Sequence, residues 1–264
     1  MHLFLLDIVT LGTRRLQMGT SIEFVLPVLN EERVLNTSIN ILKDYLDNNL
    51  SDYRWSILIA DNGSSDATSE IAMSLVADDT RIQYLRLEKR GRGRALKQAW
   101  LNSDADILGY MDIDMSTNLA IIPQMILLIL DDQNDLVIGS RILNGSVVKR
   151  RPLFREFLSR SYSMLIRTMF LTGFVDAQCG FKILTVKAAQ EILPAVKDNG
   201  WFFDTELLLL AEDNGYSVAE VPVEWTDDPD SRVRIINTIW EDLKGLLRLR
   251  FGGLKRSSKI IKRP

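Results

Sequence analysis

The chain has 264 residues, of which 46% are hydrophobic, and a formal net charge of −3. This length and composition suffice for one large domain with a full core. A single cysteine, Cys179, excludes an intramolecular disulfide and fits a reducing compartment, and a single histidine, His2, argues against catalytic triads and zinc sites built on histidine. Any chemistry must therefore come from carboxylates, Arg, Lys, hydroxyl groups or a bound metal ion.

Strand-like and helix-like segments alternate through the first half of the chain. The predicted strands are 21–26, 55–60, 82–87, 107–111 and 136–138, and the predicted helices are 33–48, 67–76, 93–102 and 119–130. This order is typical of an α/β domain with a mainly parallel sheet and right-handed crossovers. We predict an N-terminal extension over 1–20, one α/β domain over 21–232, and an amphipathic, basic segment over 233–264.

Polar clusters follow four of the predicted strands. They are residues 27–32, 61–68, 112–117 and 139–141. Because ligands bind at the carboxyl ends of strands in open α/β sheets, we expect these clusters to converge at one edge. Asp112 and Asp114 offer hard oxygen ligands for Mg²⁺ or Mn²⁺, which in turn can hold a diphosphate. A solvated turn is the alternative interpretation of an isolated Asp-x-Asp motif.

The motifs at these positions resemble those of family 2 glycosyltransferases with a GT-A fold, a Rossmann-like architecture. The matching segments are 27–31, 61–68, 112–114 and 140–141. Segments further along resemble the polyprenyl-phosphate glycosyltransferases, which include dolichyl-phosphate mannose and dolichyl-phosphate glucose synthases. They are Arg155, 159–160, 176–182, 204–206, 220–225 and 231–232. The segment Gln178–Lys182 is closer to the glucosyl branch, and Ser116 stands where the mannose synthases often have Gln.

The resemblance implies an inverting, metal-dependent glycosyltransferase. It would move a hexose from a nucleotide sugar, UDP-glucose or GDP-mannose, to a polyprenyl or dolichyl phosphate. A lipid phosphate is already an anion and can attack the anomeric carbon without a base. The departing nucleoside diphosphate needs a metal ion and cations to neutralise its charge. The alternatives are a family 2 enzyme with a glycan or other non-lipid acceptor, and a catalytically silent nucleotide-binding subunit.

The same resemblance assigns candidate site residues. Metal and diphosphate binding falls to Asp112 and Asp114. Acceptor-phosphate binding falls to Arg141, Arg155, Ser159 and Arg232, since Arg side chains suit phosphate oxygens. The nucleoside pocket would contain Pro27, Asn30, Glu31, Asp61, Gly91 and Lys97. A solvated basic face is the alternative for Lys149, Arg150, Arg151 and Arg155.

Three further features have two interpretations each. Asp204 and Glu206 could position sugar hydroxyls or shape the acceptor side, or Asp204 could cap a helix. Segment 201–203 could line the lipid path or pack under the sheet. Cys179 is expected to be a packed small residue rather than a nucleophile.

The C-terminal segment is basic and amphipathic. No acidic residue follows Asp242, and no stretch has the roughly 18–20 uninterrupted apolar residues that span a bilayer. Segments 154–171 and 234–251 have apolar residues at helical spacing with basic residues between them, typical of helices that lie in a membrane interface. Core-facing helices are the alternative. We expect a peripheral protein on anionic lipid at the cytoplasmic face of the membrane, and no nucleic-acid partner, since no aromatic stacking surface is evident.

Overall fold

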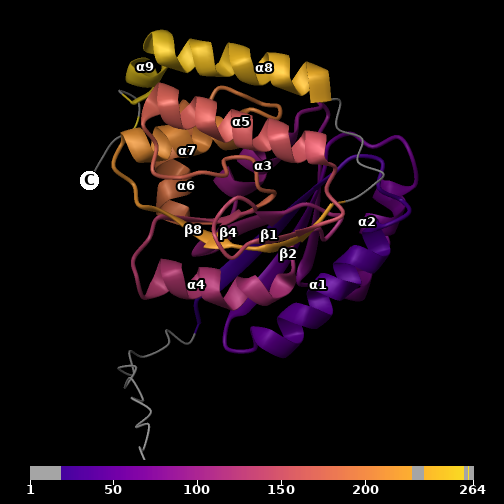
Figure 1. Ribbon diagram of the computed structural model, residues 1–264. Coiled ribbons are helices and arrows are strands. Elements are labelled where there is room, and N and C mark those ends of the chain that lie inside the picture. Colours follow the sequence, from indigo (N-terminus) through magenta and orange to yellow (C-terminus); the bar gives the residue numbers. More distant parts are fainter. Residues whose placement is uncertain (1–18, 228–234, 259–260, 262–264) are drawn as a thin grey trace, which may run out of the picture.

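The computed structural model describes residues 19–227, 235–258 and 261, and it is built around a seven-stranded sheet (Figure 1). The strand order is β3-β2-β1-β4-β7-β5-β8. The strands are β1 (Ser21–Val28), β2 (Arg54–Asp61), β3 (Ile82–Arg86), β4 (Ile107–Met111), β5 (Leu136–Ser140), β7 (Phe181–Thr185) and β8 (Val218–Pro222). β7 runs antiparallel to both β4 and β5, and the other pairs are parallel. The predicted α/β fold with a mainly parallel sheet is confirmed, whereas the reversed central strand was not predicted.

Helices cover both faces of the sheet (Figure 1). They are α1 (Leu35–Asn49), α2 (Thr68–Asp78), α3 (Arg92–Leu101), α4 (Ile122–Leu130), α5 (Leu153–Phe170), α6 (Val186–Ile192), α7 (Phe203–Asp213), α8 (Ile235–Arg248) and α9 (Leu254–Ser258). Short turns of 3₁₀ helix, η1 (Leu119–Ile121) and η2 (Leu193–Ala195), adjoin α4 and α6, and a π-helical turn, η3 (Leu249–Gly253), follows α8. Buried side chains of α1, α2 and α4 form one hydrophobic cluster with the sheet, and those of α3, α6 and α7 form another.

The alternation of side chains along β4 explains the two clusters. Ile107 and Met111 belong to the cluster with α1 and α4, and Leu108 and Tyr110 belong to the cluster with α3 and α7. This is the period of two that a strand with both faces buried requires. On the neighbouring strand β7, Lys182 is 1% exposed, so a charged side chain lies inside the core.

A second, two-stranded parallel sheet stands beside the loop that follows β4. It consists of β6 (Val147–Lys149) and β9 (Glu224–Thr226). Backbone hydrogen bonds from Asn118 to Glu224 and from Thr226 to Ser116 tie β9 to this loop. The loop that carries Asp112 and Asp114 is therefore held by paired backbone at both ends.

The C-terminal segment packs on the domain through its last helical turns. Leu246 and Leu249 are fully buried in the cluster that contains α3 and α7. Arg248 makes two hydrogen bonds, of 2.8 and 2.9 Å, to the fully buried carboxylate of Glu206 on α7. The predicted helix over 234–251 corresponds to α8 and η3, while the boundary at residue 232 lies outside the described residues and stays a prediction.

Close contact between α3 and α7 predicts a packing-sensitive position at Gly93. A Cβ added there would lie 2.4 Å from the Cβ of Phe203, so the two helices would have to separate. Alanine gains about 1 kcal/mol of helix propensity over glycine, but overpacking costs roughly 1–3 kcal/mol. We therefore expect Gly93→Ala to lower the free energy of unfolding by about 1 kcal/mol in urea denaturation, the overpacking cost less the gain in propensity. Gly200→Ala, whose added Cβ meets its nearest atom at an ordinary 3.5 Å, is the matched control and should change it little.

Candidate active site

Two loops at the carboxyl ends of β1 and β2 are fastened to each other. The backbone N–H of Asn30 donates to Ser64 Oγ at 2.9 Å, and the side-chain Oδ1 of Asn30 accepts from the Ser65 N–H at 2.8 Å. The N–H of Glu31 donates to Thr68 Oγ1 at 2.8 Å. Asn30 has a φ of 56°, a left-handed conformation that asparagine tolerates well. Three of the predicted nucleoside-pocket residues, Asn30, Glu31 and Asp61, thus belong to one hydrogen-bonded loop pair.

Asp61 lies at the base of this loop pair and is fully buried. Its Oδ1 accepts from the Ser64 N–H at 2.8 Å, and its Oδ2 accepts from Tyr84 Oη at 2.7 Å and from Arg86 at 3.2 Å. The buried carboxylate therefore fixes the loop, and Arg86 adds a charge partner on β3. Pro27 was predicted in the polar cluster after the first strand, but the structure places it inside β1, paired in register with Ala60. The turn starts after Val28 because β1 is two residues longer than its apolar run suggested.

Gly91 joins this region to α3. It has a φ of 151°, and its N–H donates to Asn62 Oδ1 at 2.6 Å. A Cβ at this position would lie 2.5 Å from the carbonyl oxygen of Asn199, so only glycine fits. Lys97, on the same helix, instead donates to the carbonyl of Val196 at 2.8 Å. Its contact therefore runs to the turn after α6 rather than to the loop pair around Asp61.

The end of β4 carries a buried network of charged groups. Arg92 donates to Asp112 Oδ1 at 2.7 Å and to Asp204 Oδ2 at 2.6 Å, so one guanidinium joins the first Asp of the motif to α7. The Oδ1 of Asp204 also accepts from Tyr110 Oη at 2.5 Å and lies 3.1 Å from Lys182 Nζ. Lys182 further donates to the Cys179 carbonyl at 2.6 Å.

The charges within this network shift one another. Burial alone would raise the pKa of Asp204, but Lys182 and Arg92 outweigh it and hold the pKa below its usual value. Burial raises the pKa of Tyr110 well above its usual value, and the neighbouring Asp204 carboxylate adds to this effect. At neutral pH the network therefore holds ionised Asp204 against two cations and a phenol that remains protonated.

Gly180 gives Asp112 the room it needs. A Cβ on Gly180 would lie 1.7 Å from Asp112 Oδ2, and the N–H of Asp112 donates to the Gly180 carbonyl at 3.1 Å. Asp112 is partly exposed and Asp114 is exposed, and Asp114 Oδ1 accepts from the Ser116 N–H at 3.0 Å. In the described part of the chain, no three or more His, Cys, Asp or Glu side chains are grouped so that they could hold a metal ion by themselves. Two carboxylates at an open edge fit a Mg²⁺ or Mn²⁺ ion that takes its other ligands from phosphate oxygens and water.

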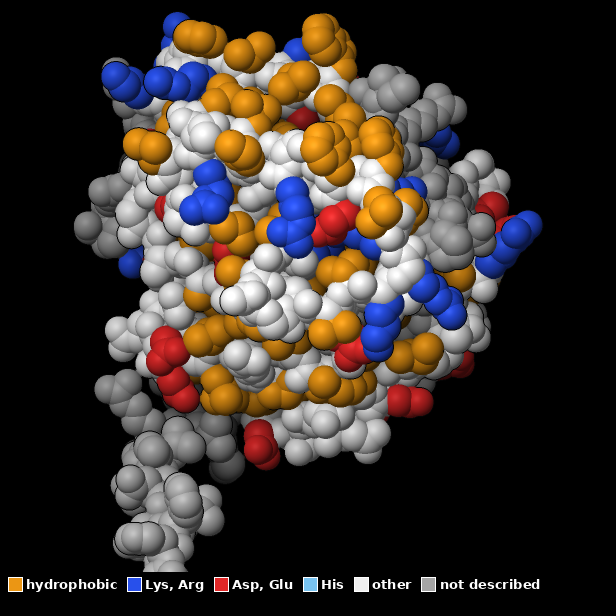
Figure 2. All heavy atoms as spheres, in the orientation of Figure 1, with side chains coloured by type: hydrophobic (Ala, Val, Ile, Leu, Met, Phe, Trp, Pro, Cys, Tyr) orange, Lys and Arg blue, Asp and Glu red, His pale blue; other side chains and the backbone are white. Residues whose placement is uncertain are grey.

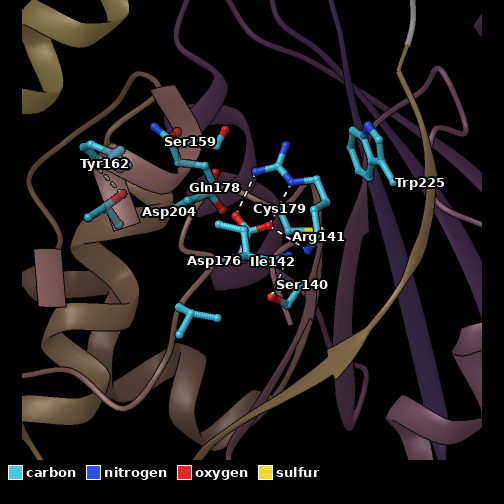
Figure 3. A network of polar contacts seen from close by, with 12 residues as sticks. Ser140, Arg141, Ile142, Ser159, Tyr162, Asp176, Gln178, Cys179, Asp204 and Trp225 are labelled. Carbon is cyan, nitrogen blue, oxygen red and sulfur yellow. Dashed lines mark hydrogen bonds and ion pairs between the residues drawn. The ribbon is translucent and has the colours of Figure 1, made fainter. Parts of the chain in front are cut away.

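Arg141, directly after β5, forms a closed pair with Asp176. Its Nε and Nη2 each lie 2.8 Å from a different oxygen of Asp176, and its backbone N–H donates to the same carboxylate at 2.9 Å. In Figure 3, Arg141 reaches toward Asp176, and Trp225 lies on its other side, with its ring centroid 5.1 Å from the guanidinium carbon. Burial would raise the pKa of Asp176, but Arg141 outweighs it and lowers that pKa.

The start of α5 brings more arginine side chains to this region. Arg155 donates to Asp227 at 3.1 Å, and Arg151 donates to Ser159 Oγ. Burial, with the like charge of Arg141 as the second cause, lowers the pKa of Arg151, so the two guanidiniums lie near each other. The structure thus brings Arg141 and the Arg151–Ser159 pair into one region. Arg155 lies on the same helix, α5, as Ser159. Arg232 lies outside the described residues.

Several sequence alternatives are resolved by these contacts. Capping by Asp204 is wrong, since α7 begins at Phe203 after Phe202, without a side-chain cap, and the Asp204 carboxylate is used by Arg92, Tyr110 and Lys182. Phe202 and Phe203 are fully buried, whereas Trp201 is 41% exposed.

Cys179 is a packed small residue, as expected. It is fully buried, and burial, followed by the charge of Asp176, raises the pKa of its thiol to about 12. The thiol therefore stays protonated and is no nucleophile at neutral pH.

Sequence reasoning missed the roles of Arg92, Tyr110, Lys182 and Arg151. One signal was available: a lysine in the otherwise apolar stretch Phe181–Leu184 must be paired when it is buried.

Comparison with known proteins places this site in a family. Residues 23–193 match the profile described as "Glycosyl transferase family 2". Glycosyltransferase AglD of Haloferax volcanii is 33% identical over 84% of this chain, but the chain spans only 35% of that protein. The dolichyl-phosphate beta-glucosyltransferase ALG5C of Trichomonas vaginalis is 32% identical over 82% of this chain and 67% of its own length. The corresponding enzyme of Dictyostelium discoideum is 29% identical over 86% and 73%.

Solved structures agree on the fold. Glucosyl-3-phosphoglycerate synthase of Mycobacterium tuberculosis superposes with a TM-score of 0.66 at 18% identity, over 88% of this chain and 81% of that one. The same enzyme in complex with Mn²⁺ and UDP-glucose superposes with a TM-score of 0.64. With the profile match covering more than half of the chain, and with the Asp-x-Asp motif at the end of β4, the protein is a glycosyltransferase that belongs to glycosyl transferase family 2.

Proposed function

We propose that this protein transfers glucose from UDP-glucose to a polyprenyl phosphate of the dolichyl type, with inversion and with the help of Mg²⁺ or Mn²⁺. Two relatives that match most of this chain are named dolichyl-phosphate beta-glucosyltransferases, and a structural neighbour was solved with Mn²⁺ and UDP-glucose. The segment Gln178–Lys182 favours glucose over mannose, as the sequence resemblance indicated.

The observation that carries this proposal is the juxtaposition of a carboxylate pair and an arginine cluster. Asp112 and Arg141 both bind the segment 176–180: the Asp112 N–H donates to the Gly180 carbonyl at 3.1 Å, and Arg141 is paired with Asp176. A donor diphosphate held beside Asp112 and an acceptor phosphate held beside Arg141 would therefore be neighbours. Cations between two phosphate groups reduce the repulsion that would otherwise keep the substrates apart.

Each part of the site then has a task. Asp112 and Asp114 would hold the metal ion, which when bound neutralises charge that develops on the leaving diphosphate. Arg141, Arg155 and Ser159 would orient the acceptor phosphate, and Arg232 would join them. One oxygen of that phosphate attacks the anomeric carbon while the bond to the diphosphate breaks. Since the phosphate is already ionised, no side chain has to remove a proton.

The test is sugar transfer from labelled donors in parallel. UDP-glucose and GDP-mannose are each incubated with the protein, a polyprenyl phosphate and either Mn²⁺ or EDTA. We expect label in the lipid fraction from UDP-glucose only, and loss of that label in EDTA. Label from GDP-mannose alone would correct the sugar, and label on a soluble glycan with none in the lipid would replace the lipid acceptor. No transfer of label from either donor would contradict the proposed reaction.

Asp114 provides a sharper prediction. Asp114→Asn keeps the size of the side chain but removes a charge, so the metal and diphosphate would lose a ligand. We expect kcat/KM to fall by at least about 100-fold, with the midpoint of thermal unfolding nearly unchanged because Asp114 is exposed. Asp104→Asn, which changes an exposed aspartate shortly before β4, is the control and should leave turnover intact. Near-normal turnover of Asp114→Asn would remove Asp114 from the metal site.

Membrane association belongs to the same proposal. Figure 2 shows apolar side chains gathered over the part of the molecule that contains α5 and α8, with Lys and Arg among them. Large apolar side chains that are exposed there include Leu153, Phe154, Phe157, Met164, Trp240, Leu247 and Phe251. None of the helices described has the length and hydropathy to cross a bilayer. We propose that this surface lies on anionic lipid at the cytoplasmic face of a membrane.

Paired substitutions test this surface. The double variant Phe157→Ser/Trp240→Ser should weaken binding to anionic phosphatidylserine vesicles about tenfold or more in a sedimentation assay, because two exposed apolar anchors, 67% and 61% exposed, are lost. The double variant Ile41→Ser/Met73→Ser removes similarly exposed apolar side chains from α1 and α2 and should bind as the wild type does. Equal binding by all three proteins would place the membrane contact elsewhere.

A further inference from the structure

Arg151 is the most weakly compensated buried cation near the acceptor side of the site. Its side chain is only 7% exposed. Its Nε and Nη1 make no hydrogen bond within the described structure, although Nη1 lies 3.4 Å from Glu156 Oε2. Buried guanidinium groups are normally paired and hydrogen-bonded, because an uncompensated charge in a protein interior costs several kcal/mol.

Neighbouring arginines are better paired than Arg151. Arg141 has a bidentate contact with Asp176, and Arg155 donates to Asp227. Glu156, the carboxylate nearest to Arg151, is shared with Arg160, whose Nε donates to Glu156 Oε1 at 2.5 Å. A cation that is both buried and incompletely neutralised favours an added anion beside it.

The hydrogen bond that the Arg151 side chain donates also fixes a hydroxyl group. Arg151 Nη2 donates to Ser159 Oγ, so this oxygen is an acceptor in the pair. A serine hydroxyl has one proton and two lone pairs, and an occupied lone pair leaves its proton free to donate elsewhere. Arg151 therefore prepares Ser159 as an oriented donor, which is the form that a phosphate oxygen requires.

We propose that Arg151 is a positioning residue for the acceptor phosphate: it holds Ser159 as a donor and adds the positive charge of a buried guanidinium that is incompletely hydrogen-bonded within the described structure. This inference rests on the proposed function and deepens it. It gives a role in acceptor binding to Arg151, which the basic-face interpretation of 149–155 placed on a solvated surface. The interaction with the phosphate goes through Ser159 and through the field of the buried charge.

The test compares Arg151→Met, Ser159→Ala, the double variant, and the control Arg150→Met, an exposed neighbour. We expect Arg151→Met to raise the KM for polyprenyl phosphate about tenfold or more, while the KM for the nucleotide sugar changes less than about twofold. The midpoint of thermal unfolding should stay the same or rise, because a poorly compensated buried charge is replaced by an apolar chain of similar length.

Non-additivity provides a readout that a structural role would not produce. If Arg151 acts through Ser159, adding Ser159→Ala to Arg151→Met should raise the KM for the lipid phosphate much less than Ser159→Ala does alone. An unchanged lipid KM in Arg151→Met would overturn the inference. A loss shared equally by both substrates, together with a lower unfolding midpoint, would also overturn it by making Arg151 a structural residue.

Inorganic phosphate separates this inference from the proposed reaction. We expect millimolar phosphate, in EDTA, to raise the unfolding midpoint of the wild type and of Arg150→Met but not of Arg151→Met. If that difference appears while no sugar reaches the lipid, Arg151 keeps its role as an anion-site residue and the proposed function fails. If the lipid is glucosylated but phosphate protects Arg151→Met as well as the wild type, the reaction stands and the role of Arg151 is refuted.

Discussion

The buried ion pairs of Arg92 are the constraint on which the rest of the site depends. Arg92 is 11% exposed and bridges Asp112, at the end of β4, to Asp204, on α7. Lys182 supplies a second cation to Asp204 from β7. Removing one member of such a network leaves another charge uncompensated in the interior, at a cost of about 3–5 kcal/mol. These contacts hold α3, β4, β7 and α7 together around Asp112, the first carboxylate of the Asp-x-Asp motif.

The antiparallel direction of β7 makes that arrangement possible. In register, Met111 pairs with Phe181, so the residue before β7, Gly180, arrives beside the residue after β4, Asp112. A parallel strand would instead bring its last residue to this edge. The reversed strand thus places a backbone without a Cβ against a carboxylate, and it turns Lys182 to the side of the sheet where Tyr110 and Asp204 lie. The single antiparallel strand is part of how the active-site edge is built.

Sequence alone predicted the regular part of this fold, and its prediction of the site's place at the carboxyl ends of the strands stays a prediction. Apolar runs of three to six residues, four of them followed by polar clusters, located strands β1 to β5, and the Asp-x-Asp motif lies directly after β4, as predicted. Strand direction could not be predicted for β7, because an apolar run has the same pattern in both directions. The arginines at 90, 92 and 94 are equivalent in the sequence, and only the start of α3 at Arg92 determines which guanidinium turns inward. Contacts between distant segments, such as Arg92 with Asp204, have no local signal at all.

The arginines on the proposed acceptor side differ in how fully neighbouring carboxylates neutralise them. The guanidinium of Arg141 makes a bidentate contact with Asp176, and the backbone N–H of Asp176 donates to Glu220 at 2.8 Å. That chain of contacts fixes the position of Arg141 at the edge of the sheet. The Arg155 side chain makes one hydrogen bond to a described residue, Asp227, and is 26% exposed, so it can turn toward an incoming anion at little cost. In the proposed reaction, Arg155 and the buried charge of Arg151 would therefore add to the charge compensation that Arg141 gives the acceptor phosphate. Arginines that are fully paired keep the shape of the site without a ligand, and arginines that are incompletely neutralised leave positive charge available to the phosphate of the substrate.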